Sequence, residues 1–213
     1  MTSWLFRLPL SLRDRIPESL RHLARLGRHV VERGQGSLAI PTELLADCRL
    51  CASRHELVKN LSKQARVAEV GTYRGDFALH ILRACDPTEL HLIDIDVSLL
   101  DPAVTKDSRV SIHQGRSQEI LARFPDHHFD WIYIDGDHSY EGASGDARLA
   151  AGKVKPGGYL VFNDFAHADP YLGAYGVQRA VVEFAVIRGW KFVWWAYEPN
   201  ALYDVALQRP ADR

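Results

Sequence analysis

The sequence has few cysteines, one methionine and no long apolar run. Three of its 213 residues are cysteines, an odd number that argues against a disulfide framework. Cys48 and Cys51 form a single CxxC pair with no second pair downstream, whereas a structural zinc site needs about four ligands. We therefore expect packing roles for these two cysteines, ahead of zinc or redox chemistry, and a core position for Cys85.

Signals for membrane insertion or export are also missing. The longest apolar stretches, such as residues 180–187, are far too short to span a bilayer. Residues 1–12 are apolar, but they lack a basic segment before the run and a small-residue cleavage site after it. We therefore expect a cytoplasmic protein without a transmembrane segment.

The composition is that of an ordinary globular protein, with 46% apolar and 25% charged residues, but its charge is uneven. Residues 1–66 hold twelve Arg or Lys and six acidic residues, a net charge of +6; the whole chain has −1, so the remainder carries −7. Such asymmetry is found in proteins that bind nucleic acid or anionic membranes. We favour a basic segment that docks on the acidic domain or on a second subunit over one that binds a polyanion. We expect a homo-oligomer and no nucleic-acid partner.

Residues 1–60 are predicted to form a basic helical cap or lid. Apolar residues recur at helical spacing in 17–33, and two shorter helices are expected at 41–51 and 53–63. Ser53 followed by Glu56 is typical of a capping box.

Residues 61–213 alternate strands with helices. Strands are predicted at 67–70, 90–93, 110–113, 129–134, 159–162, 191–196 and 202–207, and helices at 77–84, 117–124, 140–154 and 177–188. Apolar strands that alternate with helices indicate a parallel sheet covered on both faces. We predict a doubly wound, Rossmann-like α/β domain with seven strands, the last two forming a hairpin at the sheet edge.

Ligands of such sheets bind beyond the carboxyl ends of the strands, where this sequence places glycines and acids. Glu69, Gly71, Thr72, Tyr73 and Gly75 surround the first strand-to-helix turn. Tyr73 replaces the middle glycine of a dinucleotide fingerprint, which disfavours a diphosphate ligand.

The next two strands also end in polar residues. Asp94 follows Gly75 by nineteen residues, where a carboxylate suits a ribose diol. Ser117 and Gln118 open a later helix and are suited to a ligand contact, although Ser117 could equally cap that helix.

Oxygen ligands follow the fourth and fifth strands. Asp135, Asp137 and His138 come after one strand, and Asn163 and Asp164 after the next. Since neighbouring strands lie about 4.8 Å apart, these oxygens can converge on one Mg²⁺. A softer set with His138 and His167 would select Mn, Fe or Zn, and turn formation is the alternative for each single aspartate. His127 and His128 are expected to face solvent.

These motifs resemble those of class I methyltransferases of the catechol O-methyltransferase type. The run at 134–141, the Asn163-Asp164 pair and the pattern at 176–184 are more similar to the macrocin O-methyltransferase and cephalosporin-hydroxylase-like group. The resemblance covers about residues 53–207. The catechol enzymes have Asp-Asn where this sequence has Asn-Asp.

The resemblance implies S-adenosylmethionine and a divalent metal, with Mg²⁺ favoured, as cofactors. The methionine end would be held around Glu69, Gly71, Thr72, Tyr73, Gly75 and Asp135, the ribose by Asp94, and the adenine side by Ser117 and Gln118. Asp135 and Asp164 would bind the metal, with Asn163 as a third ligand. Asp137 would be the base, with His138 as the alternative.

We therefore expect an S-adenosylmethionine-dependent, metal-assisted O-methyltransferase of a small-molecule hydroxyl. A nucleic-acid or other N-methyltransferase is the first alternative. It is disfavoured because Asp-Gly-Asp-His stands where such enzymes have an Asn/Asp-Pro-Pro-aromatic loop. An NAD-dependent oxidoreductase and a non-catalytic scaffold of the same fold are the others.

Deletion of residues 1–40 tests the lid. So short a segment cannot bury its apolar stripes alone, so it must cover the domain, a second subunit or the substrate. We expect the deletion to lower acceptor turnover strongly while calorimetry shows a change in cofactor affinity of less than about tenfold, or about 1.4 kcal/mol. Normal turnover by a truncated monomer would instead identify an oligomerisation arm.

Overall fold

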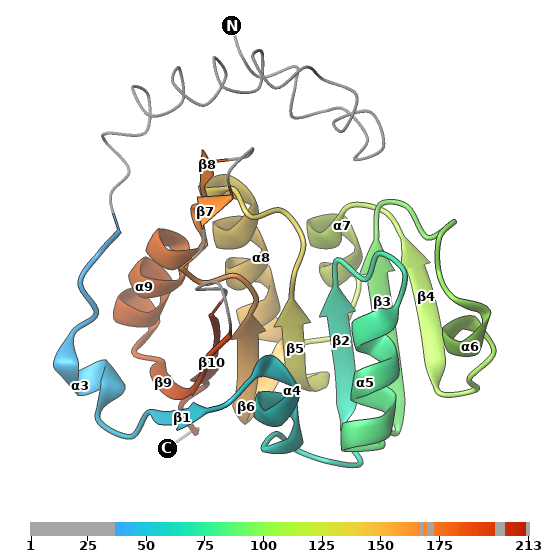
Figure 1. Ribbon diagram of the computed structural model, residues 1–213, viewed down its shortest axis with the longest axis horizontal. Helices are drawn as coiled ribbons and strands as arrows, with labels where there is room; N and C mark the ends of the chain where they lie inside the picture. Colours follow the sequence, from blue (N-terminus) through green and yellow to red (C-terminus); the bar gives the residue numbers. More distant parts are fainter. Residues whose placement is uncertain (1–36, 167, 170–172, 199–202, 212–213) are drawn as a thin grey trace, which may run out of the picture.

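The computed structural model describes residues 37–166, 168–169, 173–198 and 203–211 (Figure 1). The predicted helix at 17–33, most of the predicted cap and His167 lie outside these residues. Among the described residues, no helix is long and apolar enough to cross a membrane.

An eight-stranded sheet forms the centre of the fold, in the order β1-β9-β10-β6-β5-β2-β3-β4 (Figure 1). Its strands are β1 Arg49–Cys51, β2 Arg66–Val70, β3 Glu89–Asp94, β4 Val110–Gln114, β5 Phe129–Ile134, β6 Val154–Phe162, β9 Lys191–Ala196 and β10 Asp204–Gln208. All neighbours are parallel except β10, which is antiparallel to β6 and β9. The two-residue strands β7 Ala168–Asp169 and β8 Gly173–Ala174 form a separate antiparallel pair.

Helices cover both faces of the sheet (Figure 1). They are α3 Thr42–Leu45, α4 Arg54–Lys59, α5 Asp76–Cys85, α6 Pro102–Thr105, α7 Ser117–Leu121, α8 Tyr140–Lys153 and α9 Val177–Arg188. The alternation of strand side chains assigns each face its own core. In β5, Ile132 and Ile134 pack with α8 and α9, whereas Trp131 and Tyr133 pack with α4 and α5. The doubly wound α/β prediction is therefore confirmed.

The predicted helix at 41–51 is wrong in its second half. The helix α3 ends at Leu45, and Arg49–Cys51 is a strand that pairs in parallel with β9, with Leu50 opposite Trp195. Since β9 would otherwise present unpaired backbone groups along that side, this short strand completes its hydrogen bonding. The sheet therefore has eight strands instead of seven, and the C-terminal hairpin is not at its edge.

Two local predictions are confirmed. Ser53 caps α4, because its Oγ accepts the Glu56 N–H at 3.2 Å. Cys85 is a buried core residue, whereas Cys48 and Cys51 are partly buried. All three cysteines are free thiols, as expected from their number.

The turn after β2 depends on Gly71, which has φ +83°. A Cβ at this position would lie 2.1 Å from the Asp135 carbonyl oxygen and 2.8 Å from the Gly136 Cα, both backbone atoms that have little room to move. Gly189 also has a positive φ, +66°, but a Cβ there would meet nothing within 4 Å.

These two glycines make a matched test. Gly189→Ala should cost about 1 kcal/mol of left-handed strain, whereas Gly71→Ala adds overlap with the backbone of the neighbouring strand. We expect urea denaturation to show that Gly71→Ala lowers the free energy of unfolding by at least about 2 kcal/mol more than Gly189→Ala. Equal losses would mean that the turn can separate from Asp135 at little cost.

Candidate active site

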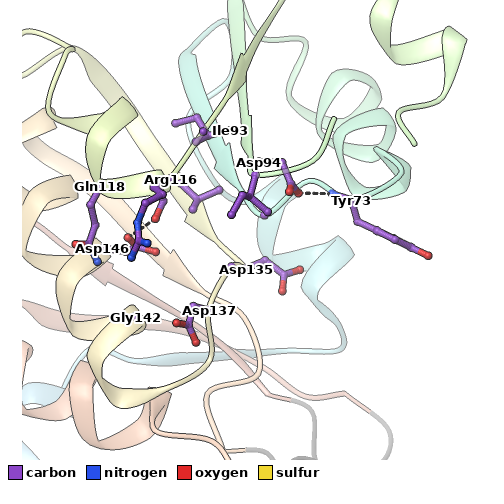
Figure 2. A pocket seen from close by; sticks show the side chains of 15 residues that line it. Tyr73, Ile93, Asp94, Arg116, Gln118, Asp135, Asp137, Gly142 and Asp146 are labelled. Carbon is purple, nitrogen blue, oxygen red and sulfur yellow. Dashed lines mark hydrogen bonds between the residues drawn. The ribbon is translucent and has the colours of Figure 1, made fainter. Parts of the chain in front are cut away.

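A cavity of about 430 Å³ lies at the carboxyl ends of the central strands (Figure 2). Its lining comes from the ends of β2 to β5, the start of α7 and the first half of α8. The lining residues are Val70, Gly71, Tyr73, Ile93, Asp94, Ile95, Gly115, Arg116, Ser117, Gln118, Asp135, Gly136, Asp137, Gly142 and Asp146. The structure therefore brings together six of the predicted cofactor residues: Gly71, Tyr73, Asp94, Ser117, Gln118 and Asp135.

Asp94, the last residue of β3, holds two backbone segments of the cavity wall. Its Oδ2 accepts the Tyr73 N–H at 2.8 Å, and its Oδ1 accepts the Asp96 N–H at 3.0 Å. Tyr73 has a left-handed φ of +48°, and its ring points away from the cavity (Figure 2). Because a carboxylate has about four lone-pair sites, each oxygen of Asp94 retains an acceptor site for a ligand hydroxyl.

Glu69 and Thr72 lie behind the cavity wall. Glu69 is 1% exposed, and its Oε2 accepts the Thr72 hydroxyl at 3.1 Å. Burial, with a smaller contribution from the charge of Asp135, raises the pKa of Glu69 to about 8. At neutral pH the Glu69 carboxyl is therefore mostly protonated and anchors the turn through Thr72.

Gly75 begins α5 with φ +84°. A Cβ here would lie 2.9 Å from Val104 Cγ2 and 3.3 Å from Leu100 Cδ2. Gly75 therefore allows close contact between the start of α5 and the segment that leads into and forms α6.

Ser117 and Gln118 both contact α8. The Ser117 hydroxyl donates to Asp146 Oδ1 at 2.6 Å, and a Cβ at Gly145 would lie 2.1 Å from Gln118 Nε2. The N-cap of α7 is Arg116, so Ser117 does not cap this helix. Burial raises the pKa of Asp146, although hydrogen bonds from Ser117 and Gln118 oppose the shift.

Sequence reasoning missed Asp146, which is 1% exposed. The sequence did contain a signal for it, because Asp146 is an acid among the alanines of one helix face. Ala143, Ala147 and Ala150 on that face are buried core residues.

Three side-chain oxygens converge on the imidazole of His138. Its Nε2 lies 3.4 Å from Asp135 Oδ1, 3.3 Å from Asn163 Oδ1 and 3.8 Å from Asp164 Oδ2. The ring stacks on Tyr175 with centroids 4.6 Å apart. Burial alone would lower the pKa of His138, but the hydrogen bond and charge of Asp135 and the charge of Asp164 together raise it. The predicted metal ligands therefore surround a position that favours a positive charge.

Buried hydrogen bonds fix the amide of Asn163. Its Nδ2 donates to Asp204 Oδ1 at 3.1 Å, and the Tyr133 hydroxyl donates to Asp204 Oδ2. Asp204 is fully buried, and burial raises its pKa to about 7. With Nδ2 committed to Asp204, Asn163 presents Oδ1 to His138.

The sequence analysis did not identify Tyr133, Asp204 or Arg54. Asp204 had a signal, because it is an acid at the start of an apolar strand. Arg54 had none: its guanidinium lies over the Phe77 ring, 4.7 Å from the centroid, and its Nη1 is 3.9 Å from Asp135 Oδ2. It thereby places a positive charge beside the buried acids.

Asp137 and His138, the two candidate bases, occupy different environments. Asp137 is exposed and lines the cavity, and its Oδ1 accepts the Ser139 N–H at 2.9 Å. A Cβ at Gly142 would lie 2.5 Å from the Asp137 Cγ, so the carboxylate packs on the first turn of α8. His138 instead faces the oxygen cluster.

Residues 68–165 match the family model described as a methyltransferase domain, a span from β2 to just beyond β6. No curated protein matches the chain. The matched segment contains all the predicted site residues.

Solved structures share the fold. An O-methyltransferase family protein from Burkholderia thailandensis aligns with TM-score 0.58 and 16% identity over 89% of this chain and 68% of that one. An S-adenosylmethionine-dependent methyltransferase from Methanosarcina mazei aligns with TM-score 0.58 and 12% identity over 76% of this chain and 100% of that one. A protein described as a hemolysin from Lactococcus lactis aligns with TM-score 0.58 and 14% identity over 74% of this chain and 84% of that one.

At these identities the structural likeness establishes the fold alone, which proteins of different descriptions share. The chemistry is supported by the family match. Together, the family match and the shared fold support a class I, S-adenosylmethionine-dependent methyltransferase.

Proposed function

We propose that the protein is a metal-assisted O-methyltransferase that transfers the methyl group of S-adenosylmethionine to a hydroxyl of a small sugar, polyol or natural product. The observation that carries this proposal is the position of Asp135. It lines the cavity beside Asp94, and its Oδ1 also belongs to the oxygen cluster around His138. A cytoplasmic location, a homo-oligomer and kinship with the macrocin O-methyltransferase group are parts of the same proposal.

The cavity suits a nucleoside joined to an amino acid. Asp94 retains acceptor sites for a ribose diol, and Ser117 and Gln118 form the wall toward α8 together with the buried Asp146. Tyr73 N–H is already bonded to Asp94, so this turn offers fewer free amides to a diphosphate than a glycine-rich loop does. When bound, S-adenosylmethionine supplies an electrophilic methyl group on a sulfonium.

The donor set fits a hard divalent cation. Two carboxylates and one amide oxygen are ligands that Mg²⁺ accepts while keeping positions for water or substrate. His138 supports the fit: its Nε2 lies within 3.8 Å of all three oxygens, which indicates that they stabilise a positive charge. When bound, the metal would orient the acceptor oxygens and lower the pKa of the hydroxyl.

His138 is the better placed of the two candidate bases. Asp137 is engaged by the Ser139 N–H and packs against Gly142, which suits a wall of the cofactor cavity. His138 Nε2 faces Asp135, Asn163 and Asp164, where the acceptor hydroxyl would lie. We therefore assign proton uptake to His138 Nε2.

Cofactor binding tests the ribose site. Asp94→Ala removes an ionised acceptor, and loss of a charge-assisted hydrogen bond costs about 1.5–3 kcal/mol. We expect calorimetry to show at least about tenfold weaker S-adenosylmethionine binding. Asp96→Ala is the matched control, because Asp96 is exposed and its Oδ1 caps the Ser98 N–H. Equal affinities of wild type and Asp94→Ala would show that the ribose binds elsewhere.

Measurements of turnover test whether methyl transfer requires a divalent metal. Methyl transfer to a panel of polyols, glycosides and catechols should disappear in excess chelator and return with Mg²⁺ or Mn²⁺, while S-adenosylmethionine affinity stays within about twofold. Full turnover in chelator would remove the metal from the mechanism and recast Asp135 and Asp164 as substrate-binding or turn residues.

Manganese binding gives a readout that needs no acceptor. Electron paramagnetic resonance should show Mn²⁺ bound to the wild type and at least about tenfold weaker binding to Asp164→Asn, since a charged ligand is lost. Asp137→Asn is the control and should bind as the wild type does. Undiminished binding by Asp164→Asn would reject the proposed ligand set.

A further inference from the structure

A second group of potential metal ligands lies at the opposite end of the sheet. Glu89 is the first residue of β3 and His91 follows two positions later, while His128 immediately precedes β5. One ligand atom from each of these side chains lies within 4.8 Å of the others, and in the described part of the chain no other set of three His, Cys, Asp or Glu residues meets this criterion. The cluster is at the amino ends of the strands, away from the cavity.

Glu89 Oε2 and His91 Nε2 are 3.2 Å apart, within hydrogen-bond distance in the absence of an ion. This separation is also close to that of two ligands on one ion. Two ligands at about 2.0–2.1 Å from a tetrahedral Zn²⁺ are separated by about 3.3 Å. His91 is 9% exposed, so its nitrogen is held in place by the surrounding core.

His128 supplies the second, independent observation. Among the described residues its Nε2 is the buried side-chain nitrogen or oxygen that has no hydrogen-bond partner, although buried polar atoms nearly always have one. The sequence analysis expected His128 to face solvent, but its side chain is only partly exposed and its Nε2 is buried. Its ring packs against Phe129 and Phe124, with centroids 4.7 and 5.3 Å away. His127, by contrast, is exposed.

A third histidine lies beside one of the candidate ligands. His91 Nδ1 lies 3.0 Å from His113 Nε2. In metal sites, the second nitrogen of a ligating histidine is commonly anchored in this way.

Arg66 places a positive charge beside the cluster. Its Nε and Nη2 bind Glu89 Oε2 and Oε1 at 2.9 and 3.0 Å, which fixes the carboxylate but adds a positive charge beside it. Arg66 and Glu89 side chains are 36% and 42% exposed, so solvent screens part of that repulsion. The ligand set of one carboxylate and two imidazoles favours Zn²⁺ over Mg²⁺.

We propose that Glu89, His91 and His128 form a site for a transition-metal dication of the Zn²⁺ type, separate from the methyl-transfer site. Since β2 lies between β3 and β5 in the sheet, an ion held here would connect two strands that do not pair with each other.

The test is Zn²⁺ calorimetry and Co²⁺ absorption on the full-length, metal-stripped protein in excess MgCl₂, which occupies oxygen-rich sites. Glu89→Gln and His128→Gln change partly exposed side chains, so circular dichroism should show that both variants fold. We expect one equivalent of Zn²⁺ bound by the wild type, at least about tenfold weaker binding by each variant, and no change in His127→Gln. The Co²⁺ complex should lack thiolate charge-transfer bands, which separates this site from Cys48 and Cys51.

Two results would overturn the proposal. One is a wild-type protein that binds no Zn²⁺ under these conditions. The other is Zn²⁺ binding that both Glu89→Gln and His128→Gln retain at full strength. Neither result depends on methyl transfer, so the proposed activity is tested separately.

Discussion

The hydrogen-bond ladder of the parallel sheet continues one residue beyond its strands, and the site depends on this continuation. The residue after each of four strands donates its N–H to the neighbouring strand at 2.8–3.0 Å. The four bonds are Gly71 to Ile93, Gly115 to Asp94, Asp135 to Val70 and Asn163 to Ile134. Each site loop is therefore fixed at its first residue. The carboxyl ends of parallel strands meet at one edge of the sheet. The backbone ladder therefore brings the polar side chains of these loops to that edge, and contacts between the side chains are not needed to place them there.

The resulting cluster of acids is electrostatically costly. Burial raises the pKa of Glu69 to about 8 and that of Asp204 to about 7. The folded protein therefore binds more protons than the unfolded chain between the unfolded pKa of these groups, near 4.5 and 3.8, and their folded values. In that window their contribution to stability falls as the pH rises. The positive charge of Arg54 offsets part of the cost, and a cation bound among Asp135, Asn163 and Asp164 would offset more.

Much of the fold could be predicted from the sequence because apolar periodicity reflects burial on both faces of the sheet. The bounds of β5, α9 and β9 match the prediction. The strand β1 could not be predicted, since a segment of three residues, two exposed and one partly buried, carries no periodicity. Its formation depends on the unpaired side of β9, a tertiary effect that a local pattern does not contain.

The candidate site divides in the same way. Residues directly after strands, such as Asp94 and Asp135, could be located because topology determines where strand ends lie. Asp204 and Tyr133 reach Asn163 across the sheet, at sequence separations of 41 and 30, and no spacing rule links them. The orphaned nitrogen of His128 likewise became visible only with the packing of Phe124 and Phe129.

Ligand chemistry at the two ends of the sheet follows from the environment of each. At the carboxyl edge, loops present carboxylate and amide oxygens, which are hard ligands that suit a weakly held ion sharing its coordination with substrate. At the amino edge, His91 belongs to β3 and His128 immediately precedes β5, so this edge presents imidazole nitrogens. Neutral nitrogen ligands bind softer ions more tightly than Mg²⁺. Under the two proposals, the two ends of one sheet therefore bind different ions because they carry different donor atoms. The carboxyl edge binds an exchangeable ion that assists methyl transfer, and the amino edge binds an ion that connects two strands.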